Sequence, residues 1–267
     1  MDNRAVGVFD SGLGGLTSVR ELRRILPNEK IVFLGDTLRI PYGTRDRETL
    51  HVFAEDDFRF LLSRDVKYII IACGTVSSNI AAEQLSAVPV PVTGVIKPAA
   101  EAAAASSSNG IIGVIATSAA VQSRAYEEKL KDLDPSFRVV SVPCPKLVPL
   151  IEAEASEDVG TALDEALKEY LLPIRDAGAD TLILGCTHYP LVSERISSFL
   201  GDSVTLIDSG AEAARAARDE MSALDLLSSG SGPEVPEFFV TSAPERFAEA
   251  AEHFLGERFS HADLVYI

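Results

Sequence analysis

Short apolar runs alternate with longer amphipathic segments along almost the whole chain. The short runs have the length of buried strands and carry charged residues only at or near their ends, and the isoleucines before Cys73 are an example. The longer segments place apolar residues three or four positions apart, which is typical of helices that bury one face. The pattern predicts strands over residues 5–10, 31–36, 69–72, 89–96, 111–115, 138–142, 181–185, 203–210 and 237–241. It predicts helices over residues 16–26, 48–63, 77–85, 98–105, 121–130, 147–153, 159–176, 211–227 and 244–255.

The alternation of strands and helices predicts an α/β fold with mostly parallel sheets. Two stretches, 69–75 and 181–188, repeat one plan: an apolar run, a small residue, a cysteine and a polar residue that could open a helix. Asp10, at the polar end of the first strand, lies 63 residues before Cys73. Thr117, at the corresponding strand end of the second half, lies 69 residues before Cys186. We therefore predict two pseudo-symmetric α/β domains with the active site in the cleft between them, a common place for small ligands. The first domain would comprise residues 1–97 plus 210–267 and the second residues 98–209.

The composition narrows the class of protein. With 267 residues, 46% of them apolar, the chain can build a sizeable core. A formal net charge of -16 argues against nucleic-acid binding, which needs a basic face. The same charge repels an anionic substrate at long range, so any anion site has to be local, made by helix N-termini and hydroxyls. The first residues lead directly into a strand and no apolar run approaches about 18 residues, so we expect a cytoplasmic protein without signal peptide or membrane contact.

Three cysteines occur, and none is spaced for a zinc site. An odd number argues against a disulfide framework, and reduced thiols suit the cytoplasm. Cys73 and Cys186 each end a predicted strand before a helix, whose free N–H groups are expected to lower the thiol pKa. Two such thiols facing one substrate could act as an acid and base pair that inverts a carbon centre. Each could instead be a small buried core residue, which is the role we expect for Cys144.

Two loops near predicted strand ends carry further candidates. Residues 11–15 form a glycine-rich turn after Asp10 that lacks the spacing of a nucleotide-binding loop. This turn either brings backbone N–H groups close to a small ligand or simply starts a helix, and Asp10 either acts in the site or caps that helix. The loop at residues 41–43 is either an ordinary surface turn or a part of the site built around an amphipathic tyrosine.

Three motifs join the cysteine stretches: DSGLGG at residues 10–15, PYG at 41–43 and GCTHYP at 185–190. Through this combination the chain resembles, almost end to end, the glutamate racemases of the cofactor-independent aspartate/glutamate racemase superfamily. The resemblance implies a racemase that interconverts L- and D-glutamate without a cofactor and supplies D-glutamate for bacterial peptidoglycan. The expected partners are the small-molecule substrate glutamate and a second copy of the chain in a homodimer, with no nucleic acid and no membrane.

The resemblance also implies roles for individual residues. Cys73 and Cys186 would be the two bases, each handling the α-proton of one enantiomer. Asp10 would orient the thiol of Cys73 or take its proton, and His188, supported by Glu152, would be the acid or base partner of Cys186. No metal ligand is expected. The expected substrate-binding residues are Asp10, Ser11, Pro41, Tyr42, Gly43, Gly74, Thr75, Thr117, Thr187 and His188.

Two positions depart from the family pattern. Gly74 stands where the family usually has Asn and Ala120 where it usually has Thr, and both family residues contact the substrate. Losing a hydrogen bond to a charged group costs about 1.5–3 kcal/mol. Lys97, where the family often has Glu, would offset part of this loss if it points inward. Two alternatives therefore stay open: a sister racemase or isomerase acting on aspartate or another acidic substrate, and a non-catalytic paralogue that binds a partner.

Overall fold

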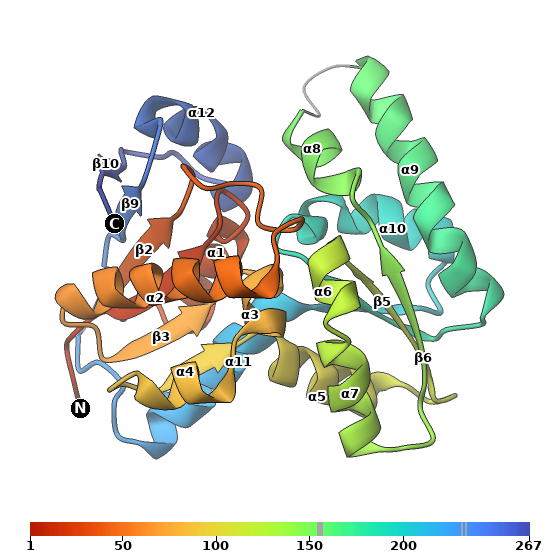
Figure 1. The fold of residues 1–267 in the computed structure, drawn as a ribbon, viewed down its shortest axis with the longest axis horizontal. Coiled ribbons are helices and arrows are strands. Elements are labelled where there is room, and N and C mark those ends of the chain that lie inside the picture. The colour runs from red at the N-terminus through yellow and green to blue at the C-terminus, as the bar shows by residue number, and fades with distance from the viewer. Residues whose placement is uncertain (154–156, 231, 233) are drawn as a thin grey trace.

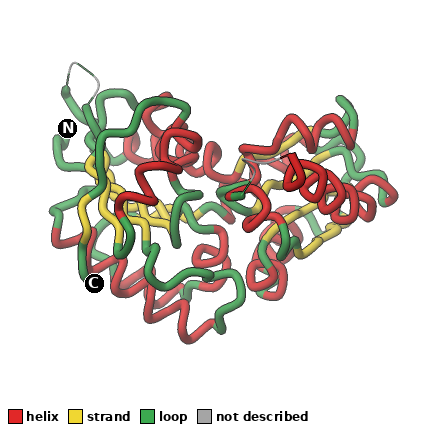
Figure 2. The backbone as a smooth tube through the Cα atoms, turned by 90° about the horizontal axis from the view of Figure 1, so that it is seen from above, coloured by secondary structure: helices red, strands yellow, loops and turns green. Residues whose placement is uncertain are grey.

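The computed structural model describes residues 1–153, 157–230, 232 and 234–267. Two parallel sheets lie side by side and helices cover them (Figure 1, Figure 2). This arrangement confirms the predicted α/β class with two similar halves. Both ends of the chain lie in the half that holds the first sheet (Figure 1).

The first sheet has the strand order β10-β9-β2-β1-β3-β4 and the second the order β6-β5-β7-β8. The described pairs of neighbouring strands run parallel. The strands are β1 (Val6–Asp10), β2 (Ile31–Gly35), β3 (Tyr68–Ile71), β4 (Val92–Gly94), β5 (Ile111–Ala116), β6 (Arg138–Pro143), β7 (Thr181–Gly185), β8 (Thr205–Asp208), β9 (Glu237–Val240) and β10 (Asp263–Leu264).

The two sheets repeat one topology. The order β2-β1-β3-β4 in the first matches β6-β5-β7-β8 in the second, so β1 and β3 correspond to β5 and β7. The first sheet is extended by the C-terminal part of the chain, because β9 pairs with β2 from Val32↔Glu237 to Gly35↔Val240. The domain boundaries at 97/98 and 209/210 stay a prediction.

Helices follow most strands, as the predicted alternation requires. None in the described part of the chain is long and apolar enough to cross a membrane. Two elements, α10 and the short strand β10, are not predicted by the sequence pattern. The helices are α1 (Leu16–Ile25), α2 (Arg47–Ser63), α3 (Gly74–Asn79), α4 (Ala82–Ala87), α5 (Ile96–Ser106), α6 (Ser118–Gln122), α7 (Ala125–Leu133), α8 (Leu147–Glu152), α9 (Glu157–Asp176), α10 (Ser193–Leu200), α11 (Ser209–Ala223) and α12 (Pro244–Leu255), with a 3-10 helix over Tyr189–Val192.

Two predicted helices are each split in two. The helix predicted over 77–85 is α3 followed by α4, and the side-chain amide of Asn79 donates to the carbonyl oxygen of Thr75 over 2.9 Å. A side chain that takes a backbone carbonyl competes with the helical hydrogen bond at that position. The helix predicted over 121–130 is α6 followed by α7, separated by Arg124 with a φ of 59°. As a result, both α3 and α6 are short helices that begin directly at a strand end.

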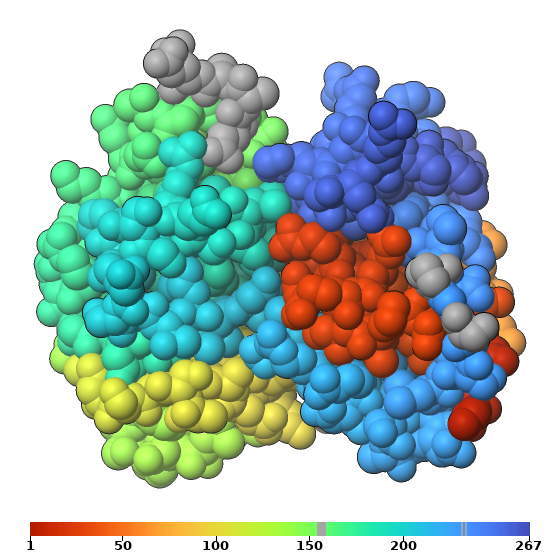
Figure 3. All heavy atoms as spheres, turned by 180° about the vertical axis from the view of Figure 1, so that it is seen from behind, coloured from red at the N-terminus to blue at the C-terminus, as the bar shows by residue number. Residues whose placement is uncertain are grey.

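The helix α11 connects the two halves. It packs against α1 and α5, and Figure 3 shows its surface below that of α1, with α12 above. One hydrophobic cluster includes Val8 of the first sheet, Ile112 of the second and Ala213 of α11. Burial of apolar surface therefore holds the two sheets in one relative position.

Asp208 caps α11, since its Oδ1 accepts the N–H groups of Gly210 over 2.9 Å and Ala211 over 3.1 Å. We expect Asp208→Ala to lower the free energy of unfolding by about 1 kcal/mol, because two N–H groups lose their acceptor. Urea unfolding measures this, with Asp208→Asn as the control that keeps an acceptor oxygen and most of the stability. An alanine variant as stable as the wild type would show that the cap contributes nothing.

Candidate active site

The candidate active site lies where the central strands end. Asp10 is the last residue of β1, and Cys73 follows the end of β3 by two residues. Thr117 and Cys186 directly follow β5 and β7. Because β1 and β3 are parallel neighbours, as are β5 and β7, each cysteine lies beside the polar end of the next strand. Ligands of parallel sheets bind beyond these carboxyl ends.

A cavity of about 600 Å³ is lined by residues of both halves. All of the predicted site residues except Asp10 contribute to its wall. Asp10 is 1% exposed and lies behind the wall, where its Oδ2 accepts the N–H of Gly12 over 3.0 Å. The predicted residues in the wall are Ser11, Pro41, Tyr42, Gly43, Cys73, Gly74, Thr75, Thr117, Glu152, Cys186, Thr187 and His188.

Two glycines allow a close approach of the two halves at this cavity. A Cβ on Gly74 would lie 2.4 Å from the carbonyl oxygen of Gly185, nearer than real Cβ atoms come to a backbone atom. A Cβ on Gly14 would lie 2.1 Å from Oγ1 of Thr187 and 2.5 Å from Nδ1 of His188. The absence of a side chain at position 74 thus lets the start of α3 lie against the end of β7.

Cys73 is a buried thiol close to a carboxylate. Its sulfur lies 3.7 Å from Oγ of Ser11. Burial and the negative charge of Asp10 raise the pKa of the Cys73 thiol to about 12. The lowered pKa predicted for Cys73 is therefore wrong, because burial outweighs the backbone N–H of Val76, which acts in the opposite direction. Burial also raises the pKa of Asp10. In the free protein Cys73 is a protonated thiol at neutral pH.

Cys186 has a cation as its neighbour. Its sulfur lies 3.8 Å from Nδ1 of His188, and Nε2 of the same ring lies 2.8 Å from Oε1 of Glu152. Burial alone would lower the pKa of His188, but the hydrogen bonds to Cys186 and Glu152 outweigh it and raise the pKa to about 10. His188 is thus an imidazolium at neutral pH, donating to Glu152 and placing a positive charge beside the sulfur.

Hydrogen bonds join the two halves at the cavity. The Oγ1 atoms of Thr75 and Thr117 lie 2.9 Å apart, and the N–H of Ala119 donates to the carbonyl oxygen of Gly43 over 3.1 Å. Thr117 also caps α6, because its Oγ1 accepts the N–H of Ala120 over 3.3 Å. These contacts fix the loop after β2 and the start of α3 against the second half.

The hydroxyl of Tyr42 is engaged outside the cavity, where it donates to Asp36. Asp36 also accepts a hydrogen bond from Thr241 over 2.8 Å and forms an ion pair with Arg39. Because the hydroxyl proton of Tyr42 is already donated to Asp36, it is not available to a ligand. The loop can therefore contact a ligand through the backbone of Tyr42 and Gly43.

Three other positions differ from expectation or extend it. The side chain of Lys97 is 70% exposed and lies 3.9 Å from Glu101, so it does not point inward. Ala120 is buried in the core and is not part of the cavity wall. Cys144 is buried, as predicted for a core residue, yet it also lines the cavity.

Among the described residues, no group of three or more His, Cys, Asp and Glu side chains is arranged to hold a metal ion.

Some wall residues were missed because they carry no local signal. Leu13 and Val148 are ordinary apolar residues in the sequence. Arg246 and Phe247 belong to α12, which comes to the cavity only because β9 joins the first sheet beside β2. A sequence pattern cannot reveal that this helix and the cysteine strands share a cavity.

Comparisons with known proteins agree with this geometry. The family Asp/Glu/Hydantoin racemase matches residues 17–217 of the chain. A glutamate racemase of Streptococcus gordonii is 42% identical over 267 residues, covering 99% of this chain and 100% of the relative. A glutamate racemase of Streptococcus pneumoniae is 43% identical over 266 residues, covering 99% of each chain.

Solved structures give the same result. The glutamate racemase isoform RacE1 of Bacillus anthracis superposes with a TM-score of 0.95 at 37% identity, covering 100% of this chain and 99% of the other. The glutamate racemase of Francisella tularensis, solved in complex with D-glutamate, gives a TM-score of 0.91 at 39% identity, with coverage of 100% and 98%. The fold predicted from the sequence is thereby confirmed.

The hydrogen bond between His188 and Glu152 predicts that the pKa of His188 depends on the carboxylate of Glu152. Glu152→Gln is expected to lower the pKa of His188, because the variant lacks a carboxylate that favours the imidazolium. NMR of histidine-labelled protein measures the change: the wild-type ring should titrate near pH 10 and the variant at lower pH. His188→Asn identifies the resonance among the four histidines. A wild-type His188 that titrates at the pH of an exposed histidine would contradict the described pairing.

Proposed function

The chain belongs to the Asp/Glu/Hydantoin racemase family, and from this premise we propose that it interconverts L- and D-glutamate. It is an amino-acid racemase by family, and the glutamate racemases of both Streptococcus species match it over nearly their whole length. The one observation that carries the substrate chemistry is the pair of thiols, Cys73 and Cys186, at matched strand ends in the wall of one cavity.

The two thiols act as a base and an acid on opposite faces of the α-carbon. For one enantiomer, Cys186 removes the α-proton as a thiolate while the Cys73 thiol delivers a proton to the other face, and the reverse holds for the other enantiomer. Their surroundings support this division. The imidazolium of His188 stabilises negative charge on Cys186, and the raised pKa of Cys73 keeps that thiol a proton donor.

Protonation has to be reset for the opposite direction. Asp10, buried beside Cys73, is placed to accept the thiol proton, and its own raised pKa brings it closer to that of a useful base. At Cys186 the imidazolium of His188 can return a proton to the sulfur, with Glu152 holding the ring. We therefore propose Asp10, His188 and Glu152 as the groups that prepare the two thiols.

Neutral donors supply most of the proposed substrate contacts. Ser11, Thr75, Thr117 and Thr187, which carry hydroxyl groups, line the cavity. Such fixed donors bind carboxylates and stabilise the charge that develops at the α-carbon when the proton leaves. The remaining proposed contacts are Pro41, Tyr42, Gly43 and Gly74.

We propose further that the D-glutamate serves bacterial peptidoglycan synthesis and that the reaction runs without a cofactor. The similarity of the chain to the glutamate racemases of both Streptococcus species supports these two proposals. The homodimer and the cytoplasmic location also stay predictions.

A second candidate, a racemase of aspartate or another acidic substrate, has one observation in its favour. Gly74 offers the cavity no side chain where the family usually has an amide. Ala120, the other departure from the family pattern, is not in the cavity wall. Of the two departures, only Gly74 therefore favours this candidate.

Deuterium incorporation tests the function directly. In heavy water, we expect L-glutamate to gain α-deuterium and lose optical rotation, and L-aspartate to react far more slowly. Cys73→Ser and Cys186→Ser should each lower racemisation about 10²- to 10⁴-fold, because one proton-transfer group is lost. Each variant should keep more exchange with one enantiomer than with the other, with opposite preferences.

The third cysteine provides the matched control. Cys144→Ser makes the same atomic change in the same cavity wall and should keep racemisation within a few-fold of wild type. Reaction with aspartate only would transfer the assignment to the second candidate. No exchange with either substrate in folded protein would favour a non-catalytic, partner-binding role.

Growth tests the cellular role. In a bacterium that needs external D-glutamate, expression of the chain should remove the requirement, and Cys73→Ser should not. Continued dependence on D-glutamate with active, expressed protein would argue against the peptidoglycan role.

A further inference from the structure

The charge of the chain poses a problem for its substrate. Glutamate carries a net charge of about -1 at neutral pH, while the protein carries -16. Field effects of this kind lower the rate at which an anion reaches its site. The hydroxyls that line the cavity act only at contact distance. A cation at the cavity mouth would weaken the electrostatic repulsion of the anionic substrate where it enters.

Within the described part of the chain, the cavity wall contains a single lysine or arginine, Arg246. Arg246 is exposed to solvent and also lines the cavity, so this residue lies at the mouth rather than on the floor. The next residue, Phe247, is buried in the wall. Farther along α12, Phe254 packs edge to face on His188 with ring centroids 5.4 Å apart. The helix that carries Arg246 is therefore fixed against the proposed active site.

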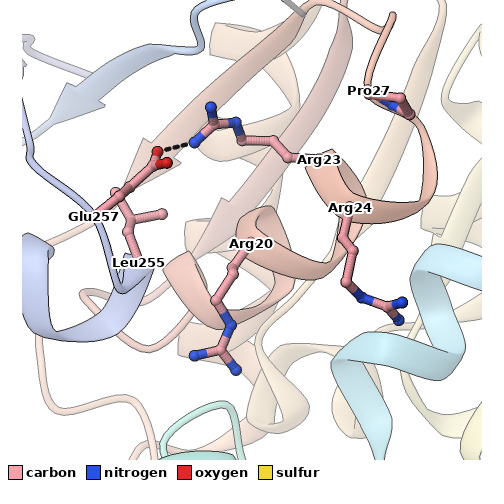
Figure 4. Close-up of a pocket in the computed structure, with 6 residues that line it drawn as sticks. All are labelled: Arg20, Arg23, Arg24, Pro27, Leu255 and Glu257. Atoms are coloured by element: carbon pink, nitrogen blue, oxygen red, sulfur yellow. Dashed lines mark hydrogen bonds and ion pairs between the residues drawn. The ribbon is translucent and has the colours of Figure 1, made fainter.

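Arg246 also differs from the three arginines of α1, which have carboxylate partners. Figure 4 shows Arg20, Arg23 and Arg24 of α1 around a smaller cavity of about 240 Å³. Arg23 forms an ion pair with Glu257, and Arg24 lies 2.9 Å from Glu21, which is 3.6 Å from Arg20.

Those charges are largely neutralised by their carboxylates. In contrast, no hydrogen bond or ion pair joins Arg246 to another described residue, and Glu249, three residues further on the helix, is not paired with it. Its charge is available to a ligand.

We infer that Arg246 captures the anionic substrate at the cavity mouth by binding one of its carboxylates. This inference rests on the proposed function and adds a residue to it. Charges at the rim of a site act on association and its salt dependence more than on later steps. Arg246 therefore lowers KM and raises kcat/KM, and it takes no part in proton transfer.

The test compares Arg246→Gln with Arg138→Gln. Arg138 is also exposed and unpaired among the described residues, but it begins β6, at the sheet edge opposite the cavity. Both variants change the net charge equally. We expect Arg246→Gln to raise the KM for L-glutamate about three- to tenfold at low salt with kcat within about twofold. The effect should shrink at about 300 mM salt, where charges are screened. Arg138→Gln should behave as wild type, and Arg246→Lys should keep most of the wild-type KM.

The outcomes separate two failures. If the wild type racemises glutamate and Arg246→Gln leaves KM unchanged, or lowers kcat at constant KM, the inference is overturned and the proposed function stands. An equal rise of KM in Arg138→Gln would assign the effect to net charge and would also overturn the inference. If the wild type does not act on glutamate at all, the proposed function fails and the inference falls with it.

Discussion

The proposed chemistry depends on how closely the strand ends of the two sheets approach each other. Cys73 belongs to one sheet and Cys186 to the other, so the space between their sulfurs is set by packing between halves and not by any local motif. Gly74 lies against the carbonyl of Gly185, and Thr75 meets Thr117 across the same boundary. Errors of about 1 Å in the position of reacting groups can cost about 10²-fold in rate. The packing of α11 against α1 and α5 therefore matters to the reaction as well as to stability.

The two thiols lie in opposite electrostatic surroundings. Cys73 is buried beside the carboxylate of Asp10, which favours the neutral thiol. Cys186 lies beside His188, which is positively charged at neutral pH because Glu152 and the sulfur hold its proton. We propose that one thiol removes a proton from one side of the substrate while the other supplies a proton to the opposite side. The reaction can run in the opposite direction only if neighbouring groups exchange protons with the two thiols. This proton exchange is the role that we propose for Asp10 and His188.

The sequence predicted those parts of the molecule that depend on local pattern. Uncharged strands and their polar ends were predicted within a few residues, because a buried parallel strand needs an apolar run and its end needs a turn. The splits between α3 and α4 and between α6 and α7 were missed, since they depend on a side-chain bond from Asn79 and on the left-handed conformation of Arg124.

Residues whose role depends on distant neighbours were the least predictable. The thiol pKa of Cys73 was predicted in the wrong direction, because burial cannot be read from the residues that follow a strand. The engagement of the Tyr42 hydroxyl by Asp36 and the arrival of Arg246 at the cavity both arise from contacts between separate elements. The predicted site residues other than Asp10 nevertheless lie in one cavity wall.

A crystal structure of the chain with glutamate bound would show whether the two thiols face opposite sides of the substrate. We expect the α-carbon to lie between the two sulfurs, with Cys73 Sγ on one face and Cys186 Sγ on the other, each within contact distance. Glutamate bound with both sulfurs on the same face, or with either sulfur out of reach of the α-carbon, would contradict this expectation.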